Sequence, residues 1–248
     1  MHRKLLTAAA VAALAHPAIA SAQATPEPID DTEVVTLTEW EYDPLYAEGW
    51  SAEQFIDDMA VYGPTGEEIG DVENLVVGPD GNILSVIAEI GGFIDIGDTH
   101  VNVPWDRIEF TQAGDGIIIP VTQETIEDFS LYPDDAPTAS EVASDIEAVD
   151  DDVEPLGRAW KATELMDDYV RLEGDVNYGY VNDLIFGEGG ALQAVVVTPD
   201  VGYGVGGYYA YPYYGYGYGF DPGLDYYGLP YAQDEVAGLE PFDYDAFE

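Results

Sequence analysis

The feature that most constrains the fold of this chain is an internal repeat in its sequence. The matching segments keep one order at an offset of 108 to 110 residues: 55–58 with 165–168, 69–70 with 178–179, 74–78 with 183–187, 83–88 with 192–197, 92–93 with 202–203, and 104–105 with 212–213. Chance does not readily give so many matches in order. The repeat therefore predicts two copies of one module.

Turn signals divide each copy into short strands. In the first copy, Ser51 and Gln54 have the spacing of a helix capping box. The sequences GPTG at 63–66 and GPDGN at 78–82 are turns, with Gly81 placed for a left-handed backbone. Strands are predicted at 59–62, 69–77, 83–90, 99–105, 107–110 and 116–121, and a short helix at 122–129. Many short antiparallel strands favour a small barrel or sandwich.

Composition sets the expected boundaries. We expect a signal peptide at 1–24, an acidic leader at 25–50, a first β domain at 51–132, an acidic proline-containing linker at 133–157 with a transient helix at 141–149, a second, divergent β domain at 158–214, and a Tyr/Gly-rich acidic tail at 215–248.

The first copy resembles the PRC-barrel family. The resemblance is carried by residues 61–70 (VYGPTGEEIG), 72–77, 79–81, the loop 92–97 (GFIDIG) and the strand 101–105 (VNVPW). It implies a mostly β fold of two tandem small antiparallel PRC-type β-barrels with short helices. The second copy resembles the family only to about Pro212. Family members include the soluble domain of the photosynthetic reaction-centre H subunit, and most are binding or assembly modules, which implies no catalytic site.

Charge and the N-terminus bear on location and partners. The 248 residues include 50 Asp or Glu and only 6 Lys or Arg, a formal charge of -44, which argues against binding to nucleic acid or anionic lipid. Arg3 and Lys4, the apolar run 5–14 and the small residues Ala22 and Ala24 are typical of a signal peptide. We therefore expect a bacterial periplasmic or secreted protein with no integral membrane segment after cleavage. The chain has no cysteine.

The search for catalytic chemistry finds no motif. No serine lies in a nucleophile elbow and no glycine-rich loop precedes a helix, so we expect no enzyme and no cofactor. His100 is the only histidine after the signal, and it is either an ordinary strand residue or a general base or ligand. Divalent cations have no firm site, and the candidates for weak association are Asp57, Asp58, Asp167 and Asp168. The alternative is that these carboxylates form only a solvated acidic surface.

Residues 202–231 hold 11 Tyr and 9 Gly. Tyrosine supplies amphipathic contact area at low entropic cost, so this segment is either a contact surface or an irregular end of the second copy. The contact-surface candidates are Tyr208, Tyr209, Tyr211, Tyr213, Tyr214, Tyr216 and Tyr218.

The sequence favours an exported, non-catalytic binding or envelope-assembly protein whose partner is another protein or a second copy of itself. One alternative is an acidic, cation-associating or salt-adapted surface protein. Another, by family analogy alone, is an accessory subunit of a photosynthetic reaction-centre-like complex.

Overall fold

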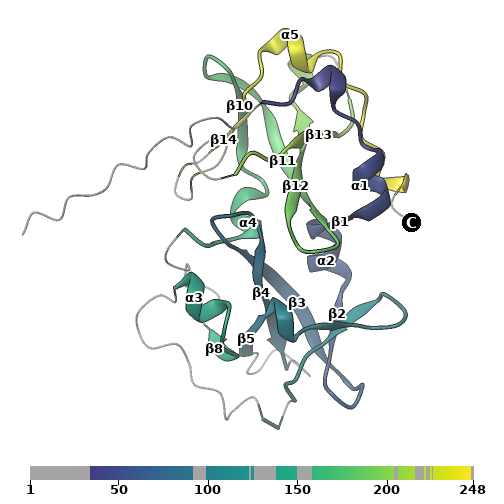
Figure 1. Ribbon diagram of the computed structural model, residues 1–248, viewed down its shortest axis with the longest axis vertical. Helices are drawn as coiled ribbons and strands as arrows, with labels where there is room; N and C mark the ends of the chain where they lie inside the picture. The colour runs from purple at the N-terminus through teal and green to yellow at the C-terminus, as the bar shows by residue number, and fades with distance from the viewer. Residues whose placement is uncertain are drawn as a thin grey trace, which may run out of the picture.

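The computed structural model describes residues 34–91, 99–122, 124–125, 138–149, 158–203, 206–215, 221, 224 and 226–246. They form two β-sheets joined at a waist where the short helices α2 and α4 lie (Figure 1). The prediction of a mostly β fold with a few helices is confirmed. Among the described helices, none has the length and apolarity needed to cross a bilayer.

The lower sheet of Figure 1 has eight strands. They are β2 (Ala60–Tyr62), β3 (Glu68–Val77), β4 (Ile83–Ile90), β5 (Thr99–Pro104), β6 (Glu109–Phe110), β7 (Gly116–Ile118), β8 (Glu147–Val149) and β9 (Trp160–Lys161). Their order is β6-β7-β2-β3-β4-β5-β8, with β9 beside β3. All neighbours are antiparallel except β2 and β7, which are parallel.

The upper sheet has six strands. They are β1 (Gly49–Ser51), β10 (Tyr169–Leu172), β11 (Val176–Gly187), β12 (Leu192–Pro199), β13 (Tyr209–Pro212) and β14 (Tyr226–Gly228). Their order is β13-β12-β11-β10-β14, with β1 beside β11, and only β10 and β14 are parallel. The segment after residue 214, expected as a tail, thus supplies a strand of this sheet.

The helices are short. They are α1 (Asp43–Glu48), α2 (Ala52–Asp58), α3 (Ala139–Val142), α4 (Ala162–Leu165) and α5 (Gln233–Val236), with 3-10 turns η1 (Leu37–Glu39), η2 (Trp105–Arg107), η4 (Val201–Tyr203) and η5 (Tyr244–Ala246). The predicted cap of α2 is confirmed, because Ser51 Oγ accepts a hydrogen bond from Gln54 N at 3.0 Å.

The segment expected as a linker departs from its prediction. Instead of one helix over 141–149, α3 begins after Thr138 with a capping box and is followed by β8, which pairs with β5. The helix predicted at 122–129 falls largely outside the described residues.

Both halves of the chain build their sheet in one order of elements. In the first half (residues 49–149), β1 and α2 precede β2 to β5, and β7 returns parallel to β2. In the second half (residues 158–246), β9 and α4 precede β10 to β13, and β14 returns parallel to β10. The correspondence therefore extends beyond the matching sequence segments, to the strand after Pro212.

The halves exchange their first strands. β1 belongs to the first half but pairs with β11, so that Trp50 lies opposite Phe186. β9 belongs to the second half but pairs with β3, so that Trp160 lies opposite Val77. Each sheet is therefore completed by a strand from the other half.

The two central hairpins also meet at their tips. Ile83 N donates to Gly190 O at 2.9 Å, and Leu192 N donates to Gly81 O at 2.8 Å. Gly81 and Gly190 have φ of +78° and +79°, so the left-handed conformation predicted for Gly81 is confirmed and recurs in the second half.

One main hydrophobic core draws on both halves. Its largest fully buried side chains include Trp160, Phe186, Tyr178, Tyr211 and Tyr227. Among the described residues no strand pairing closes either sheet, so the expected pair of tandem barrels is not confirmed. Part of each half's core is instead covered by the exchanged strand and helix of the other half.

Candidate binding site

Aromatic side chains from both halves gather where the two sheets meet. The indole of Trp50 on β1 lies 5.2 Å from the ring of Phe186 on β11 and 6.0 Å from that of Trp105 in η2, centroid to centroid. Phe55 on α2 and Phe110 on β6 extend the group, with centroids 6.2 Å apart. We call these five residues the junction cluster.

The strand exchange positions this cluster. Trp50 Nε1 donates to Gly187 O at 3.1 Å. This hydrogen bond holds the indole, which belongs to the first half of the chain, against the upper sheet. Phe55 and Phe186 are buried and form the base of the cluster. Trp50 and Trp105 are half-buried, and Phe110 is 52% exposed.

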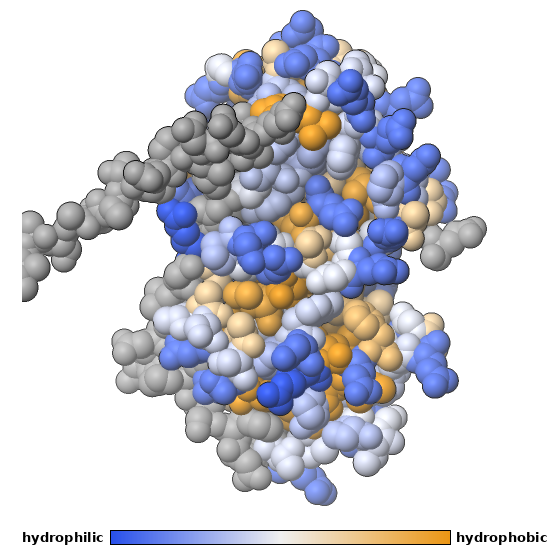
Figure 2. Space-filling view, in the orientation of Figure 1, coloured by the Kyte–Doolittle hydropathy of each residue, from blue (hydrophilic) through white to orange (hydrophobic). Residues whose placement is uncertain are grey.

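A pocket of about 480 Å³ opens beside the junction cluster. Its lining is mostly apolar and consists of Tyr46, Ala47, Gly49, Trp50, Ser51, Gln54, Phe55, Met59, Phe110 and Glu188. Figure 2 shows hydrophobic residues along the middle of the molecule, at the level where the sheets meet. A concave aromatic surface with a few polar groups is suited to hold an apolar side chain.

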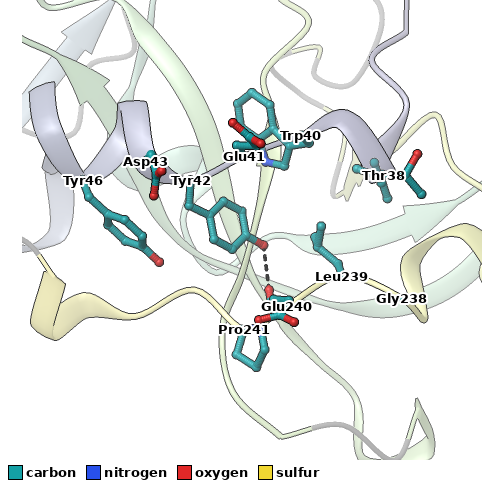
Figure 3. Close-up of a pocket in the computed structure, with 11 residues that line it drawn as sticks. Thr38, Trp40, Glu41, Tyr42, Asp43, Tyr46, Gly238, Leu239, Glu240 and Pro241 are labelled. Carbon is teal, nitrogen blue, oxygen red and sulfur yellow. Dashed lines mark hydrogen bonds between the residues drawn. The ribbon is translucent and has the colours of Figure 1, made fainter.

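A second pocket, of about 490 Å³, lies between the two ends of the described chain (Figure 3). Two of its polar side chains already have partners, since Tyr42 Oη donates to Glu240 O at 2.9 Å and Trp40 Nε1 donates to Ala210 O at 2.9 Å. Burial raises the pKa of Tyr42, which keeps its hydroxyl a neutral donor. This pocket therefore lies where α1 and the segment 238–241 are held together, and it is a weaker candidate for a ligand site than the pocket beside the junction cluster.

Two buried polar residues hold the exchanged helices. Asp183 Oδ1 accepts from Glu53 N of α2 at 2.9 Å and from Leu184 N at 2.7 Å. Asn74, at the corresponding place in β3, accepts from Thr163 N of α4 at 3.4 Å and donates to Thr163 Oγ1 at 2.7 Å. Burial raises the pKa of Asp183 to about 6, although hydrogen bonds from Ser51 and the backbone oppose the shift.

The predicted tyrosine surface is divided by the fold. Tyr209 and Tyr211 are buried, and the hydroxyls of Tyr211 and Tyr178 lie 2.6 Å apart. Tyr208 is 39% exposed, with its ring edge-on to Tyr244 at 4.9 Å. Because Tyr209 and Tyr211 are buried in the core, their side chains are not accessible to a partner.

The remaining tyrosine candidates lie at the end of β13 and beyond. Tyr213 and Tyr214 are half-buried, and the Tyr214 and Tyr231 hydroxyls are 2.5 Å apart. Tyr216 and Tyr218 fall outside the described residues.

The predicted acid pairs lie at or just after the C-terminal ends of the exchanged helices. Asp57 and Asp58 are exposed at the end of α2, and Asp167 and Asp168 come just after α4. Burial is the main cause that raises the pKa of Glu53, and the negative charges of Asp57 and Asp167 add to it. Within the described part of the chain, none of the four belongs to a group of three metal-ligating side chains.

A different set of ligands does converge: Glu73, Glu89 and His100. Sequence reasoning missed it because Glu73 lies in an irregular part of β3. Two signals were available. Glu89 is the one charged residue in the apolar run 83–90, and His100 is the one histidine after the predicted signal.

Comparison with known proteins identifies one part of the chain. A search of curated proteins found no match. Residues 56–126, which include β2 to β7, match the family model of the PRC-barrel domain. The chain therefore contains a PRC-barrel domain at residues 56–126.

Proposed function

We propose that this protein is an exported, non-catalytic binding protein that recognises a protein partner at the junction cluster. One observation carries the proposal: the exposed ring of Phe110 and the half-buried indole of Trp50 line an apolar pocket at the meeting of the two halves. Aromatic side chains in such pockets are the residues that dominate binding energy in protein interfaces. The N-terminal signal-like sequence supports a role in the bacterial envelope.

The second half is, in this proposal, a divergent second copy of the PRC-barrel module. Support comes from its order of elements, its parallel return strand and its matching hairpin tip. The pocket takes Trp50, Phe55 and Phe110 from the first half and Glu188 from the second. Joining the two copies thus creates a binding surface that one copy lacks.

The chemistry of the partner follows from the pocket and the surrounding charge. The lining offers apolar contact, with Ser51, Gln54 and Glu188 as its polar members. The chain carries a formal charge of -44, so it favours a partner that presents an apolar side chain within a basic surface.

Site-specific photocrosslinking tests this proposal. A photoreactive phenylalanine analogue at position 110 should crosslink to one protein in envelope fractions of the source cells. With that protein purified, Phe110→Ala should weaken binding by about tenfold or more, the loss expected for an interface anchor.

The matched control is Tyr180→Ala, since Tyr180 is also exposed, at 40%, but lies on β11 away from the pocket. Unchanged affinity for Phe110→Ala would contradict the proposal. Loss of binding in Tyr208→Ala alone would move the contact surface to the tyrosine segment.

A further inference from the structure

Three side chains able to ligate a metal meet on the lower sheet: Glu73 on β3, Glu89 on β4 and His100 on β5. One ligand atom from each lies within 4.8 Å of the other two. Glu89 and His100 are directly opposed across the β4–β5 ladder. Three adjacent strands therefore each contribute one donor, of two chemical kinds, to one place.

A β-bulge brings in the third donor. Val72 pairs with Ala88 and Asn74 pairs with Ile87, which leaves Glu73 as an extra residue in β3. An extra residue of this kind breaks the regular alternation of side chains and redirects one of them. Glu73 lies close to Glu89 and His100, although the partner of Glu89 in the ladder is Asp71.

The upper sheet repeats this geometry with different chemistry. Asn182 is the extra residue of the corresponding bulge in β11, between Val181 and Asp183. Thr198 and Tyr208 correspond to Glu89 and His100, because Val197–Tyr209 is the ladder pair that matches Ala88–Val101. The fold thus places three such positions together in each half.

In the upper sheet these positions are neutral and bonded to one another or to the C-terminal segment. Thr198 Oγ1 donates to Asn182 Oδ1 at 3.3 Å, and Asn182 Nδ2 donates to Tyr244 Oη at 3.4 Å. The lower sheet has two carboxylates and an imidazole at the same positions. Two carboxylates held this close repel each other, and a bound cation turns that repulsion into attraction.

We propose that Glu73, Glu89 and His100 bind one divalent transition-metal ion of the Zn²⁺ class. An imidazole with two carboxylates suits Zn²⁺ better than Ca²⁺, which takes six to eight oxygen ligands. Zinc–ligand bonds of about 2.0–2.2 Å place tetrahedral ligand atoms about 3.3–3.6 Å apart, so each pair of ligand atoms has to approach by at most about 1.5 Å. Three protein ligands leave a position open to water or to a partner's donor.

The bound ion would join β3, β4 and β5 across the face of the sheet. This site is distinct from the proposed protein-binding pocket, none of whose lining residues it shares. Either proposal can therefore fail without the other.

Calorimetric titration with Zn²⁺ tests the site. The protein is the full-length chain without an affinity tag, with His2 and His16 replaced by Gln, so that His100 is the only imidazole. We expect one Zn²⁺ per chain and at least a tenfold loss of affinity in Glu89→Gln and in His100→Gln. Glu109→Gln removes one carboxylate elsewhere in the same sheet and should leave Zn²⁺ affinity unchanged. Circular dichroism confirms that each variant is folded.

Diffuse cation binding by the acidic surface gives a different result. Zn²⁺ affinity that is the same in His100→Gln, or Ca²⁺ binding as tight as Zn²⁺ at the same stoichiometry, would overturn the proposal. Should the ligand variants not fold, X-ray absorption of the Zn²⁺-loaded parent protein decides. An imidazole nitrogen in the metal's inner shell supports the site, and a shell of oxygen alone refutes it.

Discussion

The two halves of the molecule share a strand order but carry different side chains at three corresponding positions. In the lower sheet, Glu73, Glu89 and His100 place two carboxyl groups and an imidazole at the three converging positions. In the upper sheet the matching positions are neutral, and the C-terminal segment reaches them, with Phe242 N donating to Tyr208 O at 2.7 Å. The difference teaches that the bulge belongs to the architecture, whereas the side chains placed on it are open to specialisation.

A second contrast lies in the buried residue that follows each bulge. Asn74 and Asp183 both cap the helix received from the other half, one with a neutral amide and one with a carboxyl group. The two caps share a geometry, but only the Asp183 cap has a titratable side chain.

The largest effect is expected from shortening a buried side chain in β14 or β7, the strand that pairs in parallel in each half. Tyr227 on β14 lies opposite Val170, as Ile117 on β7 lies opposite Val61, and all four side chains are buried. Tyr227→Ala should cost about 3–5 kcal/mol of unfolding free energy and Ile117→Ala about 2–5 kcal/mol. Urea denaturation followed by tryptophan fluorescence and circular dichroism measures both.

Because the main core draws on both halves, each of these variants should still unfold in a single transition. Separate transitions for the two halves would show that they are independent units. A Tyr227→Ala variant as stable as the parent would show that β14 is not part of the upper sheet.

An intermediate effect is expected from exchanging the two caps. The pKa of Asp183 is about 6 in the folded protein and about 3.9 when unfolded, so the native state holds its proton more tightly. The free energy of unfolding therefore falls as pH rises from about 4 to about 6, and the loss is complete above that window. Asp183→Asn should gain about 1–3 kcal/mol at pH 7 and remove this dependence.

Asn74→Asp is the reciprocal change and should lower stability at pH 7 by a similar amount, because it places a carboxylate in a buried site. Melting temperatures across pH 4 to 8 test the pair of variants. A parallel pH dependence in the parent and in Asp183→Asn would assign the effect to other groups.

The smallest effect is expected at the paired hydroxyls of Tyr178 and Tyr211. Burial raises the pKa of Tyr178 to about 12, so both hydroxyls stay neutral and bonded. Tyr178→Phe leaves the Tyr211 hydroxyl without this partner and should cost about 1 kcal/mol. Tyr227→Phe is the control, since the Tyr227 hydroxyl has no hydrogen-bond partner among the described residues and its loss should be nearly neutral. Equal costs in urea denaturation would contradict the assignment.

Local signals made much of the fold predictable. The cap at Ser51, the left-handed Gly81 and the strand at 83–90 depend on neighbouring residues, and all three occur in the structure. The exchange of β1 and β9 was not predictable in this way, because a strand of two or three residues carries no sign of which distant strand it will pair with.

The candidate sites were harder to predict than the fold. The alternation within one strand does not show which strands lie side by side, so the proximity of Glu73 to His100, two strands away, has no periodic signal. Composition marked the tyrosine segment as unusual, but it does not distinguish the exposed Tyr208 from its buried neighbour Tyr209. Only the pairing of β13 with β12 separates them.

The strand exchange has a consequence for how the chain reaches its native state. The ladder pairs Trp50–Phe186 and Val77–Trp160 join residues that are far apart in the sequence. Contacts of such sequence separation form slowly, because loop closure costs entropy before the pairing compensates for it. The first half therefore completes its own sheet only after the second half has been made, and until then Val76 and Val77 at the end of β3 lack their partners in β9.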